Sequence, residues 1–315
     1  MVYLSDPDVT LYCGDALEVL RDLADESVDC CVTSPPYFQQ RDYGNDRQLG
    51  LEETPTEYVT AMIGVFTEVR RVLSCSGCLW LNIGDSYAAN RSYQVSQSKH
   101  RTHDYGRSNA TCVPEGLKPK DLIGIPWRLA FALQEDGWWL RSENIWWKPN
   151  AFPESAEDRP HRAHEHVFQF SRSAHYYYDA EAVKEPAAWE RWGAQIPRKT
   201  NDSRARGAQF VKERSRQELM EMAGKRNLRS VWPINTAPFA DAHFAVMPAA
   251  VARPCIRASC PVGGIVLDPF AGTGTTGVVA LSEGRQALLI ELDAKNCALA
   301  SARLAQQSLF ADVST

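Results

Sequence analysis

Apolar and polar positions along this chain follow two periods in turn, one typical of strands and the other typical of helices. From residue 58 to 73 apolar residues recur at helical spacing, and we expect Gly77 to close this helix. Further helices are expected at 15–24, 126–134, 243–259 and 293–307. Strands are expected at 9–14, 28–33, 78–84, 138–147, 165–171, 264–268 and 286–291. This order predicts a doubly wound, mostly parallel α/β sheet, in which 138–147 and 165–171 form an antiparallel edge.

The sequence Ser34-Pro35-Pro36-Tyr37 directly follows the apolar strand expected at 28–33. Because proline contributes no N–H and fixes φ, the carbonyl groups of Ser34 and Pro35 are available to accept hydrogen bonds from a ligand. Tyr37 offers a ring on which a base can stack. Such a group suits the exocyclic amine of a base drawn out of a nucleic-acid stack. The alternative is an ordinary Pro-Pro turn that caps a strand.

A glycine-rich turn extends from Asp268 to Gly277, between a strand and a helix start. Nucleotide-like cofactors bind in such turns, and the absence of a lysine after the last glycine argues against a P-loop. Asp268 would repel a pyrophosphate, but it would pair with a cofactor that carries an amino group and a sulfonium. Glu291 ends the next strand, at a spacing typical of an acid that binds ribose hydroxyls. Together these residues suggest S-adenosyl-L-methionine.

In this order the motifs resemble the permuted (β) group of DNA amino-methyltransferases, in which the catalytic tetrapeptide precedes the cofactor loop. The matching blocks are 12–18, 33–37, 79–85, 124–128, 148–150, 164–166, 227–232 and 268–277. The serine form of the tetrapeptide is similar to the cytosine-N4 enzymes, whereas adenine-N6 enzymes mostly carry aspartate there. The resemblance implies a Rossmann-like methyltransferase fold and methyl transfer to the N4 amine of a flipped cytosine in duplex DNA. It also implies a bacterial restriction–modification system, with a possible partner endonuclease.

The same resemblance assigns roles to individual residues. The implied catalytic residues are Ser34, Pro35, Pro36 and Tyr37. Asp15 would bind the adenine amino group of the cofactor, and Glu291 would bind its ribose. The residues implied to hold the methionine portion, or to lie near the cofactor, are Thr33, Phe244, Asp268, Phe270, Gly272, Gly274 and Thr275.

Positive charge is concentrated in one segment of a chain whose net charge is −5. Residues 184–229 carry 12 Lys or Arg and six acids, a local balance of 12 − 6 = +6. This segment is poor in apolar residues and falls where the similar family inserts its target-recognition region, so we expect it to bind DNA, although a solvated helical face is the alternative. The candidate DNA contacts are Arg198, Lys199, Arg204, Arg206 and Lys212. Residues 1–183 and 230–315 would form the catalytic domain, with 87–120 as a DNA-contacting loop.

Composition favours a cytoplasmic enzyme. The nine cysteines are scattered through apolar segments, which indicates a reducing compartment. We expect neither a signal peptide nor membrane insertion, because no apolar run approaches about 18 residues. We also expect no metal, because Cys75-x-x-Cys78 lacks a second pair and His164 and His166 lack further ligands.

Other functions remain open at this point. Adenine-N6 methylation is the alternative, because the rule that separates the serine and aspartate forms has exceptions, and RNA could replace DNA as the substrate. Methylation at cytosine C5 would require a cysteine nucleophile, for which Cys255 is the candidate, but it lies in a probable helix away from the tetrapeptide. A non-catalytic DNA-binding protein would not need the tetrapeptide and the cofactor turn together.

Overall fold

The computed structural model describes the chain except for residues 42–43, 89–112, 115, 187–224, 237–246 and 312–315. The chain divides into two units, one of Met1–Tyr178 with Ser230–Thr315 and one of Asp179–Arg229. In the smaller unit β7 (Glu185–Pro186) and β8 (Lys225–Arg226) pair antiparallel, and Glu185 accepts hydrogen bonds from Arg226 and Arg229. The role expected of 184–229 in DNA recognition stays a prediction, since most of that segment lies outside the described residues.

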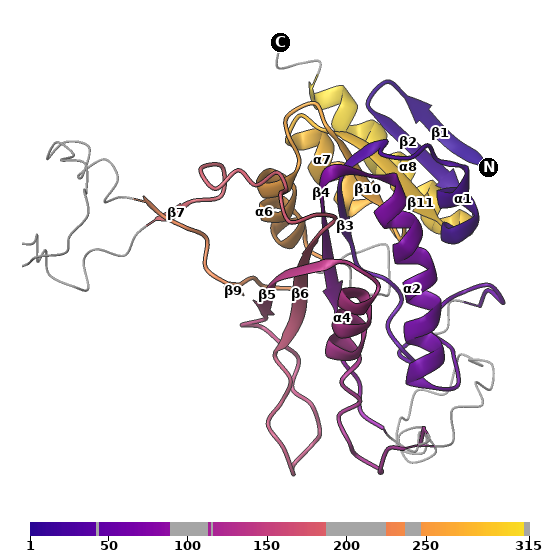
Figure 1. Cartoon of the computed structure of the whole chain (residues 1–315), viewed down its shortest axis with the longest axis vertical. Coiled ribbons are helices and arrows are strands. Elements are labelled where there is room, and N and C mark those ends of the chain that lie inside the picture. The colour runs from indigo at the N-terminus through magenta and orange to yellow at the C-terminus, as the bar shows by residue number, and fades with distance from the viewer. Residues whose placement is uncertain (42–43, 89–112, 115, 187–224, 237–246, 312–315) are drawn as a thin grey trace, which may run out of the picture. The chain divides into compact units, whose positions relative to one another are not determined.

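Nine strands of the larger unit form one sheet in the order β1-β2-β11-β10-β3-β4-β6-β5-β9 (Figure 1). The strands are β1 (Val2–Asp6), β2 (Val9–Cys13), β3 (Val28–Thr33), β4 (Leu73–Ile83), β5 (Trp139–Trp147), β6 (His164–Ser171), β9 (Val231–Pro233), β10 (Ile265–Asp268) and β11 (Gln286–Glu291). Neighbouring strands from β2 to β4 are parallel, whereas β6 is antiparallel to both β4 and β5. The doubly wound, mostly parallel fold is therefore confirmed.

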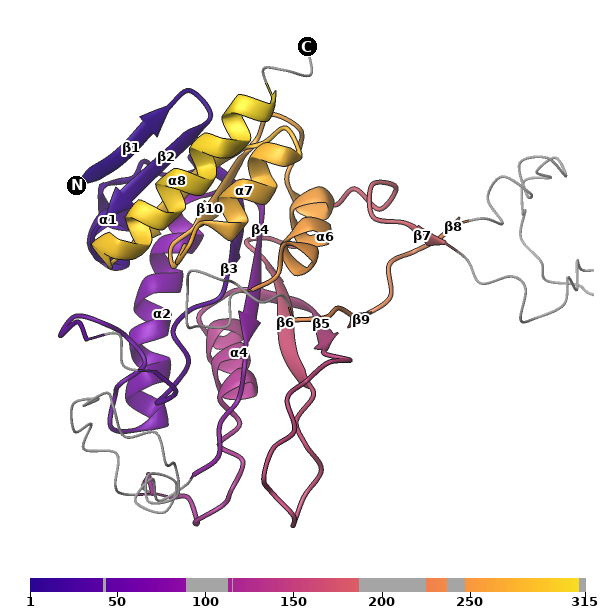
Figure 2. The same cartoon turned by 180° about the vertical axis from the view of Figure 1, so that it is seen from behind.

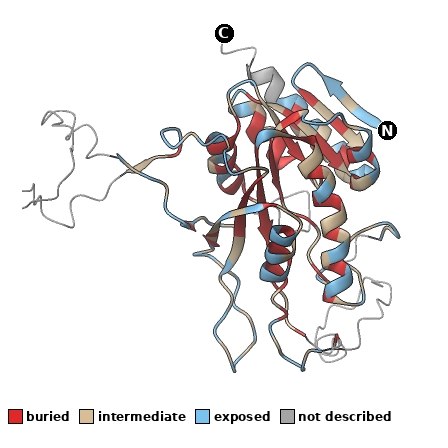
Figure 3. Ribbon diagram, viewed as in Figure 1, coloured by how far each residue is buried: buried red, intermediate tan, exposed pale blue. Residues whose placement is uncertain are grey.

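Helices cover both faces of this sheet (Figures 1 and 2). On one side α1 (Ala16–Asp22), α2 (Pro55–Val72) and α4 (Ile125–Glu135) pack in sequence, and on the other α6 (Ala249–Ser259), α7 (Thr275–Ser282) and α8 (Ala294–Ala311) do so. The inner strands between these layers, above all β3, β4 and β10, are largely buried (Figure 3). Because parallel strands present their carboxyl ends at one edge, the segments after β2, β3, β10 and β11 meet there.

Local sequence explains where two of the helices begin. The Asp15 side chain caps α1 by accepting a hydrogen bond from the N–H of Glu18 at 3.0 Å. Thr54 and Glu57 form a capping box at the start of α2, where Pro55 occupies the first helical position. Asp15 thus stands at a helix start as well as at the carboxyl end of β2.

The predicted helix end at Gly77 is wrong. Helix α2 ends at Val72 and β4 begins directly at Leu73, so Gly77 lies inside the strand. The pairing of β3 with β4 shifts register between Leu73 and Cys78, and a Cβ at Gly77 would lie only 2.9 Å from the Leu73 Cδ2 atom. The glycine therefore permits close packing within a bulge and does not cap the helix.

Other differences from the expected elements lie at the sheet edges and before α6. Strands β1 and β9 were not predicted, and β9 lies beyond the expected antiparallel pair at the edge of the sheet. The helix expected at 243–259 begins at Ala249, after Pro248, and residues 243–246 lie outside the described part. Both added strands are short or exposed, so they lack the apolar runs by which the inner strands were predicted.

Gly274→Ala should destabilise the protein more than Gly263→Ala does. Both glycines have left-handed φ angles, 78° and 79°, so each alanine should cost about 1–2 kcal/mol. At Gly274, however, an added Cβ would also lie 3.0 Å from the Ala300 Cβ atom of α8, whereas it would meet nothing within 4 Å at Gly263. Urea unfolding should give an extra loss of about 1–3 kcal/mol for Gly274→Ala. Equal losses would show that the α7–α8 contact tolerates the methyl group.

Candidate active site

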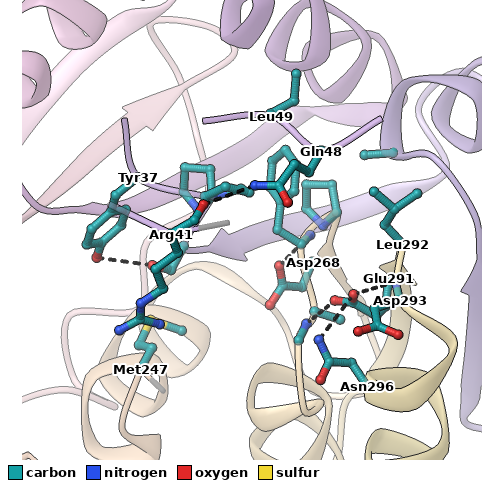
Figure 4. A pocket seen from close by; sticks show the side chains of 18 of the residues that line it. Tyr37, Arg41, Gln48, Leu49, Met247, Asp268, Glu291, Leu292, Asp293 and Asn296 are labelled. Carbon is teal, nitrogen blue, oxygen red and sulfur yellow. Dashed lines mark hydrogen bonds between the residues drawn. The ribbon is translucent and has the colours of Figure 1, made fainter. Parts of the chain in front are cut away.

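The two sequence motifs line one cavity of about 420 Å³ at the carboxyl edge of the sheet (Figure 4). The tetrapeptide Ser34–Tyr37 follows β3, and the turn Asp268–Thr273 follows β10. These two strands are adjacent and parallel, with Cys31 paired to Leu267. Segments more than 230 residues apart in the sequence thus form one site, and a hydrogen bond from the Thr33 hydroxyl to Asp268 joins them.

Most of the predicted site residues of the catalytic domain line this cavity. They are Asp15, Ser34, Pro35, Pro36, Tyr37, Asp268, Phe270, Gly272, Thr275 and Glu291. Thr33 and Gly274 are not among the cavity-lining residues that the structure describes. Phe244 and the predicted DNA contacts Arg198, Lys199, Arg204, Arg206 and Lys212 lie outside the described residues.

Thr33 and Gly274 support the cavity wall from behind. Thr33 is fully buried, and its hydroxyl donates a hydrogen bond to Asp268 Oδ1 at 2.7 Å. Gly274 begins α7 and packs against Ala300. Neither residue lines the cavity, so their contact with the cofactor stays a prediction.

Asp268 is a buried carboxylate whose hydrogen-bond donors are all neutral. Its Oδ1 atom accepts from the Thr33 hydroxyl and from the Phe270 N–H at 3.0 Å, and its Oδ2 atom accepts from the Thr276 hydroxyl at 2.7 Å. Burial raises the pKa of Asp268, although these hydrogen bonds act in the opposite direction. A positively charged ligand group in the cavity would offset the cost of the buried charge.

Glu291 holds the glycine-rich turn at the other side of the cavity. Its Oε2 atom accepts from the Gly272 N–H at 2.8 Å, and its Oε1 atom accepts from the Asp293 N–H at 2.8 Å. The Asn296 amide approaches Oε1 at 3.4 Å (Figure 4). Burial also raises the pKa of Glu291. This end of the cavity therefore carries one buried acid, Asp268, and one partly buried acid, Glu291, each accepting hydrogen bonds from neutral groups.

The tetrapeptide is fixed by one internal hydrogen bond and by contacts with two neighbouring parts of the chain. The Tyr58 hydroxyl of α2 donates to the Pro36 carbonyl at 2.9 Å. The Ser34 hydroxyl donates to the Tyr37 hydroxyl oxygen at 3.2 Å. Gly84, just after β4, gives the Tyr37 ring its place, because a Cβ there would lie 2.7 Å from the ring atom Cε2. Ser34 and Tyr37 thus reach the cavity from a constrained turn.

Three cavity-lining residues of this end were not assigned by sequence reasoning: Asn82, Lys148 and Glu165. Asn82 lies near the end of β4, Lys148 follows β5, and Glu165 is the second residue of β6. Each belongs to a sequence block that matches the similar family, and that was the available signal. Glu165 stands between His164 and His166, and alternation along a strand places it on the opposite face from both.

The described residues give no support to a cysteine nucleophile or to a metal site. Cys255 is fully buried in α6, where its thiol donates to the Val251 carbonyl and burial raises its pKa well above the ordinary value. Within the described ranges no three His, Cys, Asp or Glu side chains gather as metal ligands would. Among the same residues, no helix has the length and apolar character needed to cross a membrane.

Asp268→Asn should change how the stability of the ligand-free protein depends on pH. Burial raises the folded-state pKa of Asp268 above its unfolded value, so ionisation of this carboxyl destabilises the fold. Protonation removes this destabilisation as the pH falls through the raised pKa. The free energy of unfolding of the original protein, relative to Asp268→Asn, should therefore rise as the pH is lowered from neutrality. Urea unfolding across this range measures it. A pH-independent difference would show that the carboxyl is well solvated.

Comparisons with known proteins agree with this site. The family model N6_N4_Mtase, a DNA methylase model, matches residues 28–302. The Type II methyltransferase M.Cfr9I of Citrobacter freundii is 48% identical over 296 residues, which are 94% of this chain and 87% of that protein. M.SmaI of Serratia marcescens, also a Type II methyltransferase, is 45% identical over 292 residues, which are 92% of this chain and 89% of that protein.

Two solved structures share the fold at lower identity. The PvuII DNA methyltransferase (cytosine-N4-specific) superposes with a TM-score of 0.62 at 19% identity, covering 95% of this chain and 87% of that one. The M1.HpyAVI–SAM complex superposes with a TM-score of 0.52 at 16% identity, covering 94% of this chain and 98% of that one. From the family match and the relatives of high identity, the chain belongs to the N6/N4 family of S-adenosyl-L-methionine-dependent DNA methylases.

Proposed function

We propose that this protein transfers a methyl group from S-adenosyl-L-methionine to the exocyclic N4 amine of a cytosine flipped out of duplex DNA. One observation carries the proposal: the amine-binding tetrapeptide and the acidic glycine-rich turn line the same cavity. A methyl donor and an acceptor amine bound at these two places would lie close together without bulk water between them. The Type II relatives support a role in a restriction–modification system, with an endonuclease as a possible partner.

The acidic end of the cavity suits the cofactor. When bound there, S-adenosyl-L-methionine supplies a methyl group activated by a positively charged sulfonium. Asp268 and the turn containing Phe270 would hold the methionine portion, Glu291 the ribose, and Asp15 the adenine amino group. The buried carboxylates support this assignment, because a cationic ligand offsets the desolvation that raises the pKa of Asp268 and of Glu291.

The tetrapeptide would activate an amine that is a poor nucleophile. The lone pair of an exocyclic amine is delocalised into the base ring, so the site must direct it at the methyl group. Hydrogen bonds from the two N–H groups to Ser34 Oγ and the Pro35 carbonyl would favour a pyramidal nitrogen. Tyr37 would stack on the base, and the lack of a side chain at Gly84 leaves room for its ring. The methylated nitrogen is then strongly acidic and needs only a weak proton acceptor.

The serine of the tetrapeptide favours cytosine N4 over adenine N6 as the target. An adenine-N6 enzyme of this family is the alternative. The printed name of the PvuII enzyme, cytosine-N4-specific, supports the first reading for a protein of the same fold. A DNA-binding protein without activity is disfavoured, because it would need neither the tetrapeptide nor its hydrogen-bonded support.

DNA recognition would come from segments outside the cavity. The basic segment 184–229 would contact phosphates and read major-groove edges through Arg198, Lys199, Arg204, Arg206 and Lys212, and 87–120 would contact DNA beside it. We place the enzyme in the bacterial cytoplasm, where its DNA substrate lies.

Ser34→Ala should lower the rate of methyl transfer to DNA by about 10²–10³-fold, because it removes an acceptor that aligns with the amine as the nitrogen becomes pyramidal. Single-turnover transfer of labelled methyl groups measures the rate, and calorimetry should give unchanged affinity for S-adenosyl-L-methionine. Ser282→Ala is the matched control, since that hydroxyl binds the Val279 carbonyl at the end of α7. An undiminished rate in Ser34→Ala would contradict the assignment.

Asp268→Asn and Glu291→Gln should each weaken S-adenosyl-L-methionine binding by about tenfold or more in the absence of DNA, because each removes an ionised partner of the cofactor. Isothermal calorimetry measures the affinity. Glu283→Gln serves as the control, since Glu283 pairs with Arg257 on the far side of α7. Normal affinity in both cavity variants would mean that the cofactor binds elsewhere.

A further inference from the structure

Glu165 lies at the centre of a buried polar cluster behind the tetrapeptide. Its Oε2 atom accepts hydrogen bonds from the Tyr37 hydroxyl at 2.7 Å and from the Asn82 amide at 3.0 Å, while its Oε1 atom pairs with Lys148. Only 15% of the Glu165 side chain and 18% of the Lys148 side chain is exposed. The carboxylate is thus held from three directions, by groups from the catalytic turn, β4 and the end of β5.

The hydrogen-bond capacity of Tyr37 fixes the direction in which its hydroxyl points. A phenol has one hydrogen and two lone pairs, and an ionised carboxylate can only accept. Tyr37 therefore donates to Glu165, and its oxygen accepts from the Asn82 amide at 2.9 Å and from the Ser34 hydroxyl at 3.2 Å. Burial raises the pKa of Tyr37 well above its ordinary value, so the hydroxyl keeps its proton. Every hydrogen-bonding site of this hydroxyl is used.

The direction of the Tyr37 hydroxyl decides the direction of the Ser34 hydroxyl. The Asn82 amide has two hydrogens and three acceptors in reach, and its contacts with Tyr37 and Glu165 are shorter than its 3.3 Å contact with Ser34. The Ser34 hydrogen is directed at Tyr37, which leaves lone pairs of Ser34 Oγ for a group in the cavity. A serine that turned its hydrogen into the cavity would instead meet the N–H of the target amine, donor against donor.

We propose that Glu165, held by Lys148, is a positioning residue for methyl transfer: it orients the hydroxyls of Tyr37 and Ser34 so that Ser34 Oγ accepts from the target amine. This role rests on the proposed function of the tetrapeptide. Glu143 on β5 provides a contrast. Its carboxylate also contacts a nitrogen of a neighbouring side chain, His166 Nδ1 at 2.7 Å, but Glu143 is not among the residues that line the cavity. A merely structural ion pair would not need the contacts that Glu165 makes with Tyr37 and Asn82.

A double-mutant cycle of Glu165→Gln and Tyr37→Phe tests the proposal. A glutamine can turn its NH₂ group toward Tyr37, which reverses the hydroxyl chain, so Glu165→Gln should lower the single-turnover rate by about 10–100-fold. Tyr37→Phe removes the acceptor of the Ser34 hydrogen and should cost a similar factor. Because both act through one chain, the double variant should lose no more than the worse single variant. Affinity for S-adenosyl-L-methionine should stay the same, and Glu143→Gln should keep the full rate.

Losses that multiply in the double variant, or a full rate in Glu165→Gln, would overturn the proposal. If Glu165→Gln does not fold, a cycle of Tyr37→Phe with Ser34→Ala gives the decision: Tyr37→Phe should slow the serine enzyme but leave the rate of Ser34→Ala almost unchanged. If Tyr37→Phe slowed the serine enzyme and Ser34→Ala equally, the proposed series of hydrogen bonds from Glu165 through Tyr37 to Ser34 would be contradicted. Total label on DNA is counted whichever base receives it. The proposed function fails if the original enzyme labels no DNA, whereas this inference fails only through the cycles.

Discussion

The site depends on the buried carboxylate of Asp268. It accepts hydrogen bonds from Thr33 at the end of β3, from Thr276 in the first turn of α7 and from the N–H of Phe270 in the cofactor turn. Three parts of the chain are thus fixed to one another at the carboxyl edge of the sheet. Because Thr33 directly precedes the tetrapeptide, the hydrogen bond to Asp268 also sets the tetrapeptide beside the glycine-rich turn. This contact brings the two motifs together although they lie at opposite ends of the sequence.

The ionised carboxylate of Asp268 carries an electrostatic cost because it is buried. Asp268 is buried and Glu291 is partly buried among neutral donors, and burial raises the pKa of each. The charge required to bind the methyl donor is therefore present at some cost in stability, as is usual where a fold places ionisable groups for function. At the other end of the cavity the charge is balanced internally, because Glu165 pairs with Lys148. The cofactor end suits a cation, and the base end suits a neutral amine.

Much of the fold and both motifs could be predicted because their signals are local. Short apolar strands, the helical stripe of α2, and the turns after β3 and β10 are visible in consecutive residues, and parallel strands bring such turns to one edge. The long-range contacts could not be predicted in this way. Nothing in consecutive residues joins Glu165 to Tyr37, because these two residues are 128 positions apart in the sequence. Gly77 was misassigned because a glycine after a helical stripe usually indicates a helix end. Here it is required by close packing against the Leu73 side chain within the bulge of β4.

The central claim is that the cavity methylates the N4 amine of cytosine. Plasmid DNA incubated with the enzyme and S-adenosyl-L-methionine, then digested to nucleosides, can be analysed by mass spectrometry and co-elution with standards. We expect N4-methyldeoxycytidine, formed about 10²–10³-fold more slowly when Ser34 is replaced by alanine. N6-methyldeoxyadenosine as the product would keep the site but contradict the cytosine assignment, and 5-methyldeoxycytidine would contradict the amine mechanism itself.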